Sequence, residues 1–93
     1  MTTLRIQYDR TKDLINQHKH RGISLADTEF VFYDEKALTR PDRNHDEPRW
    51  VTLGMDANGR LLVVAYTYRE PDVVRVISAR RATTREQHQY LEA

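Results

Sequence analysis

The second half of the chain has a two-residue hydrophobic period, and this pattern limits the possible folds more than any other feature. Three alternating segments of strand length follow one another at 49–55, 60–68 and 73–81. The first two flank the sequence DANG at 56–59, in which Asn-Gly favours a tight hairpin. The turn after the second contains Pro71. Because consecutive strands joined by short turns usually pair, we expect an antiparallel meander.

The first half predicts a short strand and then a helix. Residues 4–8 alternate between apolar and polar, as a strand does. Asp9 is placed to cap a helix that runs from residue 10 to about residue 20. Leu14 and Ile15 are the apolar residues of this helix, so we expect them on its inner face.

A second helix is predicted over residues 24–32, because the S-x-x-D spacing at 24–27 is an N-cap signal. Its core-facing residues would be Ala26, Phe30 and Tyr33. Residues 40–48 contain two prolines and no large apolar side chain, which predicts a loop. The T-x-x-E sequence at 83–86 matches a capping box and starts a last helix to about Leu91. The order β-α-α-(β)-β-β-β-α, with helices ahead of the sheet, indicates the α+β class.

Length and composition exclude several classes of protein. A chain of 93 residues is long enough for one domain, so we expect residues 1–93 to form a single unit. The absence of cysteine excludes disulfides, thiolate catalysis and cysteine-ligated metals. No apolar run approaches the ~20 residues of a spanning helix. A reducing cytosol is the compartment that we expect.

The net charge of +1 is unevenly distributed. Residues 1–22 hold five Lys and Arg against two Asp, and residues 48–93 hold seven Arg against five acidic residues. The segment 23–47 is acidic, with seven Asp and Glu against three basic residues. If the two basic ends meet in space they form one basic face; an ordinary solvated surface is the alternative.

Arginines interrupt the strand predicted at 73–81. Strict alternation would place Arg75 and Arg81 on one face and Arg80 on the other. A partly buried guanidinium needs a carboxylate or a phosphate as partner. For Arg75 the two partners are equally expected. Arg80 stands at a strand end before a helix N-terminus, where free N–H groups favour a phosphate.

Two further positions could contribute chemistry. Lys19 and His20 end the first helix; lysine can stabilise a charged phosphate and histidine can move a proton near neutral pH. A basic pair there also complements the helix dipole without any substrate. Trp50 follows Arg49 and could stack on a base, although a lone tryptophan is usually part of a core. The histidines lack metal-ligand spacing, so no metal site is expected.

Several segments together resemble a known family. They are YDRTKDLINQHKHRGISL, DEKALTRPDRNHDEPRW, TLGM, LLVVAYTYRE and VVRVISARRATTREQHQY, in this order. The chain resembles the BrnT toxins of bacterial type II toxin–antitoxin pairs over about residues 6–90. The N-x-x-K-H element at 16–20 and the I-S-A-R-R-A-T element at 77–83 carry the resemblance most specifically.

The resemblance implies a RelE-like fold, in which N-terminal helices pack on an antiparallel sheet (β-α-α-β-β-β-β) and a C-terminal helix follows. It implies an endoribonuclease toxin that needs no metal or cofactor. Its partners would be RNA and a BrnA-like ribbon-helix-helix antitoxin, through which operator DNA is bound indirectly; no membrane is implied. The catalytic residues would be Arg49, Arg80, Lys19 and His20. The RNA-binding residues would be Arg75, Arg81 and Trp50.

The sequence leaves two other functions open. A non-catalytic module that binds nucleic acid or protein would keep the basic surface and would cleave nothing. A structural subunit of an oligomer would neither bind nor cleave RNA, even at low salt, where phosphate contacts are strongest.

Overall fold

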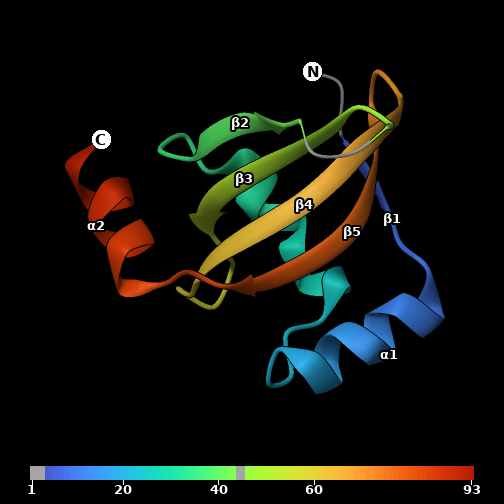
Figure 1. The fold of residues 1–93 in the computed structure, drawn as a ribbon, viewed down its shortest axis with the longest axis horizontal. Helices are drawn as coiled ribbons and strands as arrows, with labels where there is room; N and C mark the ends of the chain where they lie inside the picture. Colours follow the sequence, from blue (N-terminus) through green and yellow to red (C-terminus); the bar gives the residue numbers. More distant parts are fainter. Residues whose placement is uncertain (1–3, 44–45) are drawn as a thin grey trace.

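A five-stranded sheet carries helices on both of its faces (Figure 1). The computed structural model describes residues 4–43 and 46–93. The elements are β1 (Arg5–Gln7), α1 (Arg10–Lys19), the 3-10 helix η1 (Leu25–Tyr33), β2 (Leu38–Asp42), β3 (Arg49–Met55), β4 (Leu61–Glu70), β5 (Val73–Arg81) and α2 (Thr84–Glu92). None of the helices in the described part is long and apolar enough to cross a membrane.

The strand order is β1-β5-β4-β3-β2. The predicted meander is confirmed, because β3, β4 and β5 pair in sequence and antiparallel. The expectation of a wholly antiparallel sheet is wrong at one edge, where the short β1 adds parallel to β5 next to residues 73–75. The later residues of β5 are not paired with β1 along that edge.

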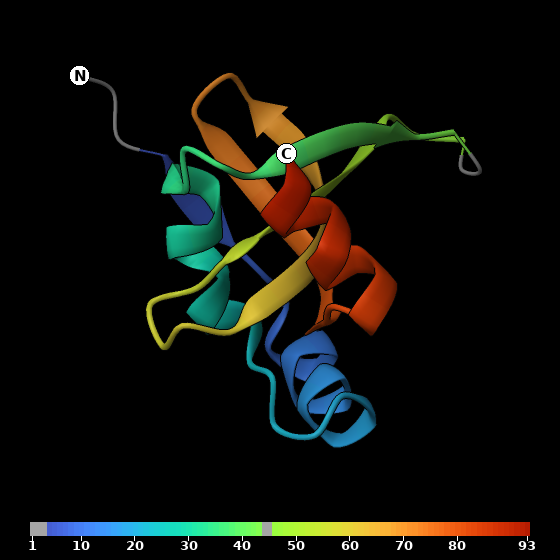
Figure 2. The ribbon, with the colours of Figure 1, turned by 90° about the vertical axis from the view of Figure 1, so that its left-hand side faces the viewer.

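The two faces of the sheet differ in how far they are covered. The inner face packs against η1 around the main core, to which the residues Leu62, Val64 and Tyr66 of β4 belong, and α1 lies beside the β5 edge. The opposite face bears a smaller apolar cluster, which Tyr90 of α2 covers at one end. Figure 2 shows η1 and α2 on opposite sides of the sheet. We call the side that α2 only partly covers the open face.

The prediction of which residues of the second helix face the core is wrong. Ala26, Phe30 and Tyr33 are exposed, whereas the buried positions are Leu25, Thr28 and Val31. The segment is a 3-10 helix, whose period of three places every third residue on one side. Ser24 is its N-cap, as expected. The N-cap signal marked where the element begins, but it contained no information about the helical period.

The expected inner face of α1 is also wrong. Leu14 and Ile15 are 63% and 59% exposed, and the buried residues are Asp13 and Asn16. The carboxylate of Asp13 accepts hydrogen bonds from the Leu25 backbone N–H at 2.6 Å and from the Ser24 hydroxyl at 3.1 Å. Polar bonds, and not an apolar stripe, hold this helix to the protein.

The loop predicted at 40–48 is shorter than expected. Residues 40–42 belong to the edge strand β2, and positions 44–45 lie outside the described residues. Pro41 is tolerated because an edge strand can spare a backbone N–H. The pairing of β2 with β3 places Arg40 opposite Val51 and Asp42 opposite Arg49.

Candidate functional site

A bulge in β5 decides which arginines share a face. Ala65 pairs with Ser78 whereas Tyr66 pairs with Val76, so Ile77 is an extra residue in the ladder. The strict alternation expected for this strand is therefore wrong beyond Val76. A bulge of this kind re-aims the side chains that follow it.

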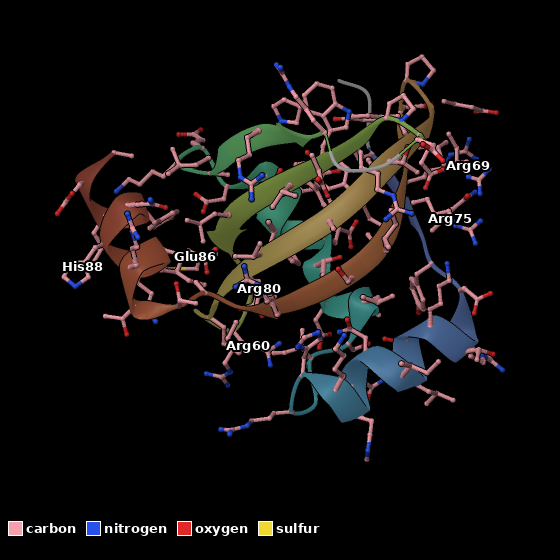
Figure 3. The ribbon with its side chains drawn as sticks, in the orientation of Figure 1. Arg60, Arg69, Arg75, Arg80, Glu86 and His88 are labelled. Carbon is pink, nitrogen blue, oxygen red and sulfur yellow. The ribbon has the colours of Figure 1, made fainter. Side chains whose placement is uncertain are left out.

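The consequence is that Arg75 and Arg80 point to the same side. Arg75 stands opposite Thr67 and Arg80 opposite Val63, and both partners lie on the open face. Arg75 and Arg80 are an odd number of residues apart and would face opposite ways in a regular strand. Figure 3 shows them towards the two ends of β5.

The middle of the open face has no large side chains. Val51 of β3, Ala65 of β4 and Ser78 of β5 stand opposite one another and form a low floor. Arg40 lies beside this floor on β2, opposite Val51. Small residues in the centre and cations at the margins make a hollow that suits an anionic chain.

The side chain of Asn16 fixes α1 against β5. Its Nδ2 donates to the Ala79 carbonyl at 2.9 Å and to the Ile23 carbonyl at 2.8 Å, while its Oδ1 accepts from the Ala79 N–H at 3.1 Å. The amide thus pairs with β5 as a neighbouring strand would, at the part of the edge that β1 leaves uncovered. Asn16 is 5% exposed. This bond sets the last turn of α1 beside Arg80.

Lys19, His20 and Arg80 are brought together by this arrangement. All three line a groove of about 330 Å³ whose other walls include Arg40 and Ser78. We call it the basic groove. Loss of hydration lowers the pKa of His20, and the positive charges of Lys19 and Arg80 lower it further. The imidazole is therefore predominantly neutral near pH 7 and able to accept a proton.

The helix end at His20 is shaped by two residues in left-handed conformations. Arg21 has a φ of 52° and Gly22 a φ of 86°. The Gly22 N–H donates to the Gln17 carbonyl at 2.7 Å, and the His20 N–H donates to the Asn16 carbonyl at 2.8 Å. Arg21 stands between the C-cap residue His20 and Gly22, and His20 lies next to the basic groove.

Arg80 is oriented by Glu86. Its Nη1 and Nη2 donate to the two Glu86 carboxylate oxygens at 2.7 and 3.0 Å. Glu86 also accepts from the Thr83 N–H in the predicted capping box, which is confirmed. Arg80 lowers the pKa of Glu86 to about 2. The Arg80 side chain remains 41% exposed, and a guanidinium has five N–H groups, so some of them still face the groove.

Arg49 lies on the open face but outside the basic groove. Its neighbour Trp50 packs half-buried against the main core, which turns Arg49 the other way. The Arg49 Nε and Nη2 atoms each lie 2.9 Å from Glu47 Oε1. From the spacing of strands and residues, roughly 16 Å separates the Cα atoms of Arg49 and Arg80. The structure thus places both arginines on one side, each with a carboxylate partner.

The other predicted residues fall into three places. Arg81 joins Lys19 and His20 around a neighbouring hollow that also contains Arg80. Arg75 lies near Asp9, at the N-terminus of α1; the pKa of Asp9 is lowered chiefly by the hydrogen bond from the Lys12 N–H and to a small extent by the charge of Arg75. Trp50 is at the β2–β3 end, with Arg49. Arg40 was not predicted, because a basic residue inside a proline-rich segment looks like part of a solvated loop.

The chain is similar to known proteins both in sequence and in structure. The family model "Ribonuclease toxin, BrnT, of type II toxin-antitoxin system" matches residues 8–86. The crystal structure of the Brucella abortus ribonuclease toxin BrnT is similar, with a TM-score of 0.69 and 25% sequence identity. The match covers 88% of this chain and 100% of the Brucella chain. A search of curated proteins finds no significant match.

Asn16→Ala should destabilise the protein by ~2–3 kcal/mol, because it leaves the buried N–H and C=O groups of Ala79 without partners. Leu14→Ala, in the same helix, should change the free energy of unfolding by less than ~0.5 kcal/mol, because its side chain is exposed. Urea unfolding of both variants measures the contrast. Equal losses would show that apolar contacts, and not the amide, hold α1.

Glu86→Gln should lower stability at neutral pH by about 1 kcal/mol, because the partly exposed ion pair with Arg80 is lost. The folded-state pKa of Glu86 is depressed from 4.5 to about 2. Its contribution is therefore complete above pH 4.5 and is lost as the pH falls towards 2. The difference between wild type and Glu86→Gln, measured by unfolding at a series of pH values, should narrow across that interval. A constant difference would contradict the ion pair.

Proposed function

The chain belongs to the BrnT family of ribonuclease toxins of type II toxin–antitoxin systems, and on that premise we propose that it is a metal-independent endoribonuclease that inhibits translation. It would cleave RNA by attack of the 2′-hydroxyl on the adjacent phosphorus. The products would be a 2′,3′-cyclic phosphate and a 5′-hydroxyl. RNA supplies its own nucleophile in this reaction, so the protein needs only to position the chain, stabilise charge and transfer protons.

The observation that carries the proposal is the meeting of Lys19, His20 and Arg80 at the basic groove. Arg80 does not titrate near neutral pH, and its free N–H groups would stabilise the charge on the phosphoryl oxygens. Glu86 holds the guanidinium in place and acts as a positioning residue. Lys19 would add a second positive charge to the same phosphate.

His20 would be the general base. Its lowered pKa keeps the imidazole neutral at the pH of the cell, which suits removal of the 2′-hydroxyl proton and is unfavourable for a general acid. Holding the 2′-oxygen in line with the leaving 5′-oxygen is the second requirement of the reaction.

The remaining arginines would hold RNA on either side of the scissile phosphate. Arg75 and Arg49 lie on the open face, away from the basic groove, and suit flanking phosphates. Arg81 lies beside the groove and would contact the next phosphate. Trp50 is partly exposed beside Arg49, where it could stack on a base of the same strand. Arg49 would therefore assist binding more than the chemical step.

The same family membership supports the expected partners. A type II toxin has an antitoxin, and we propose a BrnA-like ribbon-helix-helix protein that covers the basic groove and binds operator DNA. We propose a cytoplasmic location, where RNA and the antitoxin are found. The fold would be of RelE-like type, which the antiparallel meander with η1 against its inner face and α1 beside its β5 edge supports.

One observation favours a non-catalytic binding module as the second candidate. Arg80 and Arg49 each have a carboxylate partner, which reduces the positive potential that a substrate would meet. Such a module would bind RNA or protein through the open face and would cleave nothing.

Incubation of the purified protein with end-labelled single-stranded RNA in EDTA should give cleavage with cyclic-phosphate ends, and DNA of the same sequence should remain intact. Arg80→Ala should lower kcat/KM by about two to three orders of magnitude, as loss of an oxyanion-stabilising donor does. His88→Ala, on the outer side of α2, is the matched control and should cleave normally (Figure 3). Binding without cleavage would favour the second candidate, and cleavage only with added Mg²⁺ would exclude the mechanism.

The pH dependence of kcat/KM should show a limb set by His20. Activity should rise with pH through a pKa below 6.5, as the imidazole loses its proton and becomes a base. His20→Gln should lower the rate by ~10²-fold or more and remove that limb. A limb in which activity falls with rising pH through the same range would assign His20 as the acid instead.

A further inference from the structure

The open face continues beyond the basic groove into an apolar cleft between β2 and α2. Leu38, Val51 and Leu53 form its floor, and Glu86 and Gln89 of α2 stand at its rim. Its volume is about 210 Å³. The cleft and the basic groove share Arg40, Val51 and Val63, so they are two ends of one depression. We call this second end the apolar cleft.

The apolar cleft lies one nucleotide away from the predicted scissile phosphate. Leu53 pairs with Val63 and Val63 pairs with Arg80, so these three residues lie in one row across the sheet, perpendicular to the strands. Because neighbouring strands are about 4.8 Å apart, the Cα atoms of Leu53 and Arg80 are separated by roughly 10 Å. A single nucleotide spans such a distance from its phosphate to its base.

The chemistry of the apolar cleft suits a base and not a phosphate. An apolar floor offers no hydrogen bond to an anion, and the Glu86 carboxylate at the rim is an acceptor whose two oxygens are already bound by Arg80. A nucleobase has an apolar π-face that packs on aliphatic side chains, and the plane of an arginine guanidinium can stack on such a face. The Arg40 side chain makes no hydrogen bond or ion pair to the residues that the structure describes, so its guanidinium is available for such stacking.

Gln89 is the side chain at the rim that can recognise a base edge. Its amide has two donors and an acceptor, and it forms no hydrogen bond within the described part of the chain. Glu86, by contrast, is engaged by Arg80 and Thr83. α2 is a firm support for Gln89, because the Tyr90 hydroxyl, one residue further on, donates to Asp34 at 2.7 Å.

We propose that the apolar cleft binds the nucleobase next to the scissile phosphate and that Gln89 determines which base is accepted. The inference rests on the proposed ribonuclease activity and deepens it by assigning a base-specificity subsite. Arg40 would stack on the bound base at the junction of the apolar cleft and the basic groove.

The test uses single-stranded RNA with a randomised central segment, cleaved in EDTA and sequenced at the new ends. Wild type should prefer one base at a position adjacent to the cut. Gln89→Ala should reduce that preference roughly tenfold, as expected for loss of a two-bond contact to a base edge. Gln89→Glu keeps an acceptor and loses both donors, so it should shift the preference to bases that present a donor. Leu38→Ala should raise KM for the preferred sequence more than it lowers kcat.

The control is His88→Ala, which lies on the same helix and outside the apolar cleft, and which should keep the wild-type preference. Wild-type cleavage with no base preference, or an unchanged preference in both Gln89 variants, would overturn the inference and leave the ribonuclease activity intact. No cleavage by wild type would instead refute the proposed function. If Gln89→Ala and Leu38→Ala weakened antitoxin binding and left the cleavage pattern unchanged, the cleft would be a protein-docking site and the inference would be wrong.

Discussion

The pairing of the Asn16 amide with Ala79 is the interaction on which the site depends. One side chain satisfies both backbone groups of Ala79 and, as a third group, the Ile23 carbonyl, all away from water. Unpaired buried groups of this kind are costly, so the amide is held firmly. It also replaces a neighbouring strand at an edge that would otherwise be open. Because Lys19 and His20 follow Asn16 within one turn of helix, their position beside Arg80 is a direct result of this bond.

A second constraint acts on the other partner of the site. The extra residue at Ile77 keeps Val74 and Val76 in the core and also turns Ala79 towards it, while Arg80 points to the open face. The same bulge therefore presents the Ala79 backbone to Asn16 next to an arginine aimed at solvent. Backbone irregularities of this type are common beside functional sites because they separate the demands of the core from those of the surface.

Arg80 shows how a charged group can be both held and available. Glu86 binds two of its nitrogens and also caps α2, so the guanidinium, the turn and the helix form one unit. The pairing reduces the charge that a phosphate would meet, but it also removes the entropy of a free arginine side chain. Pre-organisation of this kind favours a group whose task is to stabilise charge that develops during a reaction. Arg49 is instead paired with Glu47, which lies only two residues away in the sequence.

Local patterns in the sequence determined the elements of this protein, and only the tertiary structure decided how their faces were used. Alternation predicted β3, β4 and β5, and the capping signals at Asp9, Ser24 and Thr83 predicted where three helices begin, because such signals act within a few residues. The resemblance to the BrnT family indicated the candidate site residues.

The faces were predicted poorly because they depend on contacts between distant residues. Three features each result from a partner far away in the chain: Asn16 is buried in place of Leu14, β5 has a bulge at Ile77, and Arg40 lies in the wall of the basic groove. A period or a motif records which residues are close in sequence. Which groups must lose water together is decided by packing, and this is why the basic groove appears only when α1, β2 and β5 are assembled.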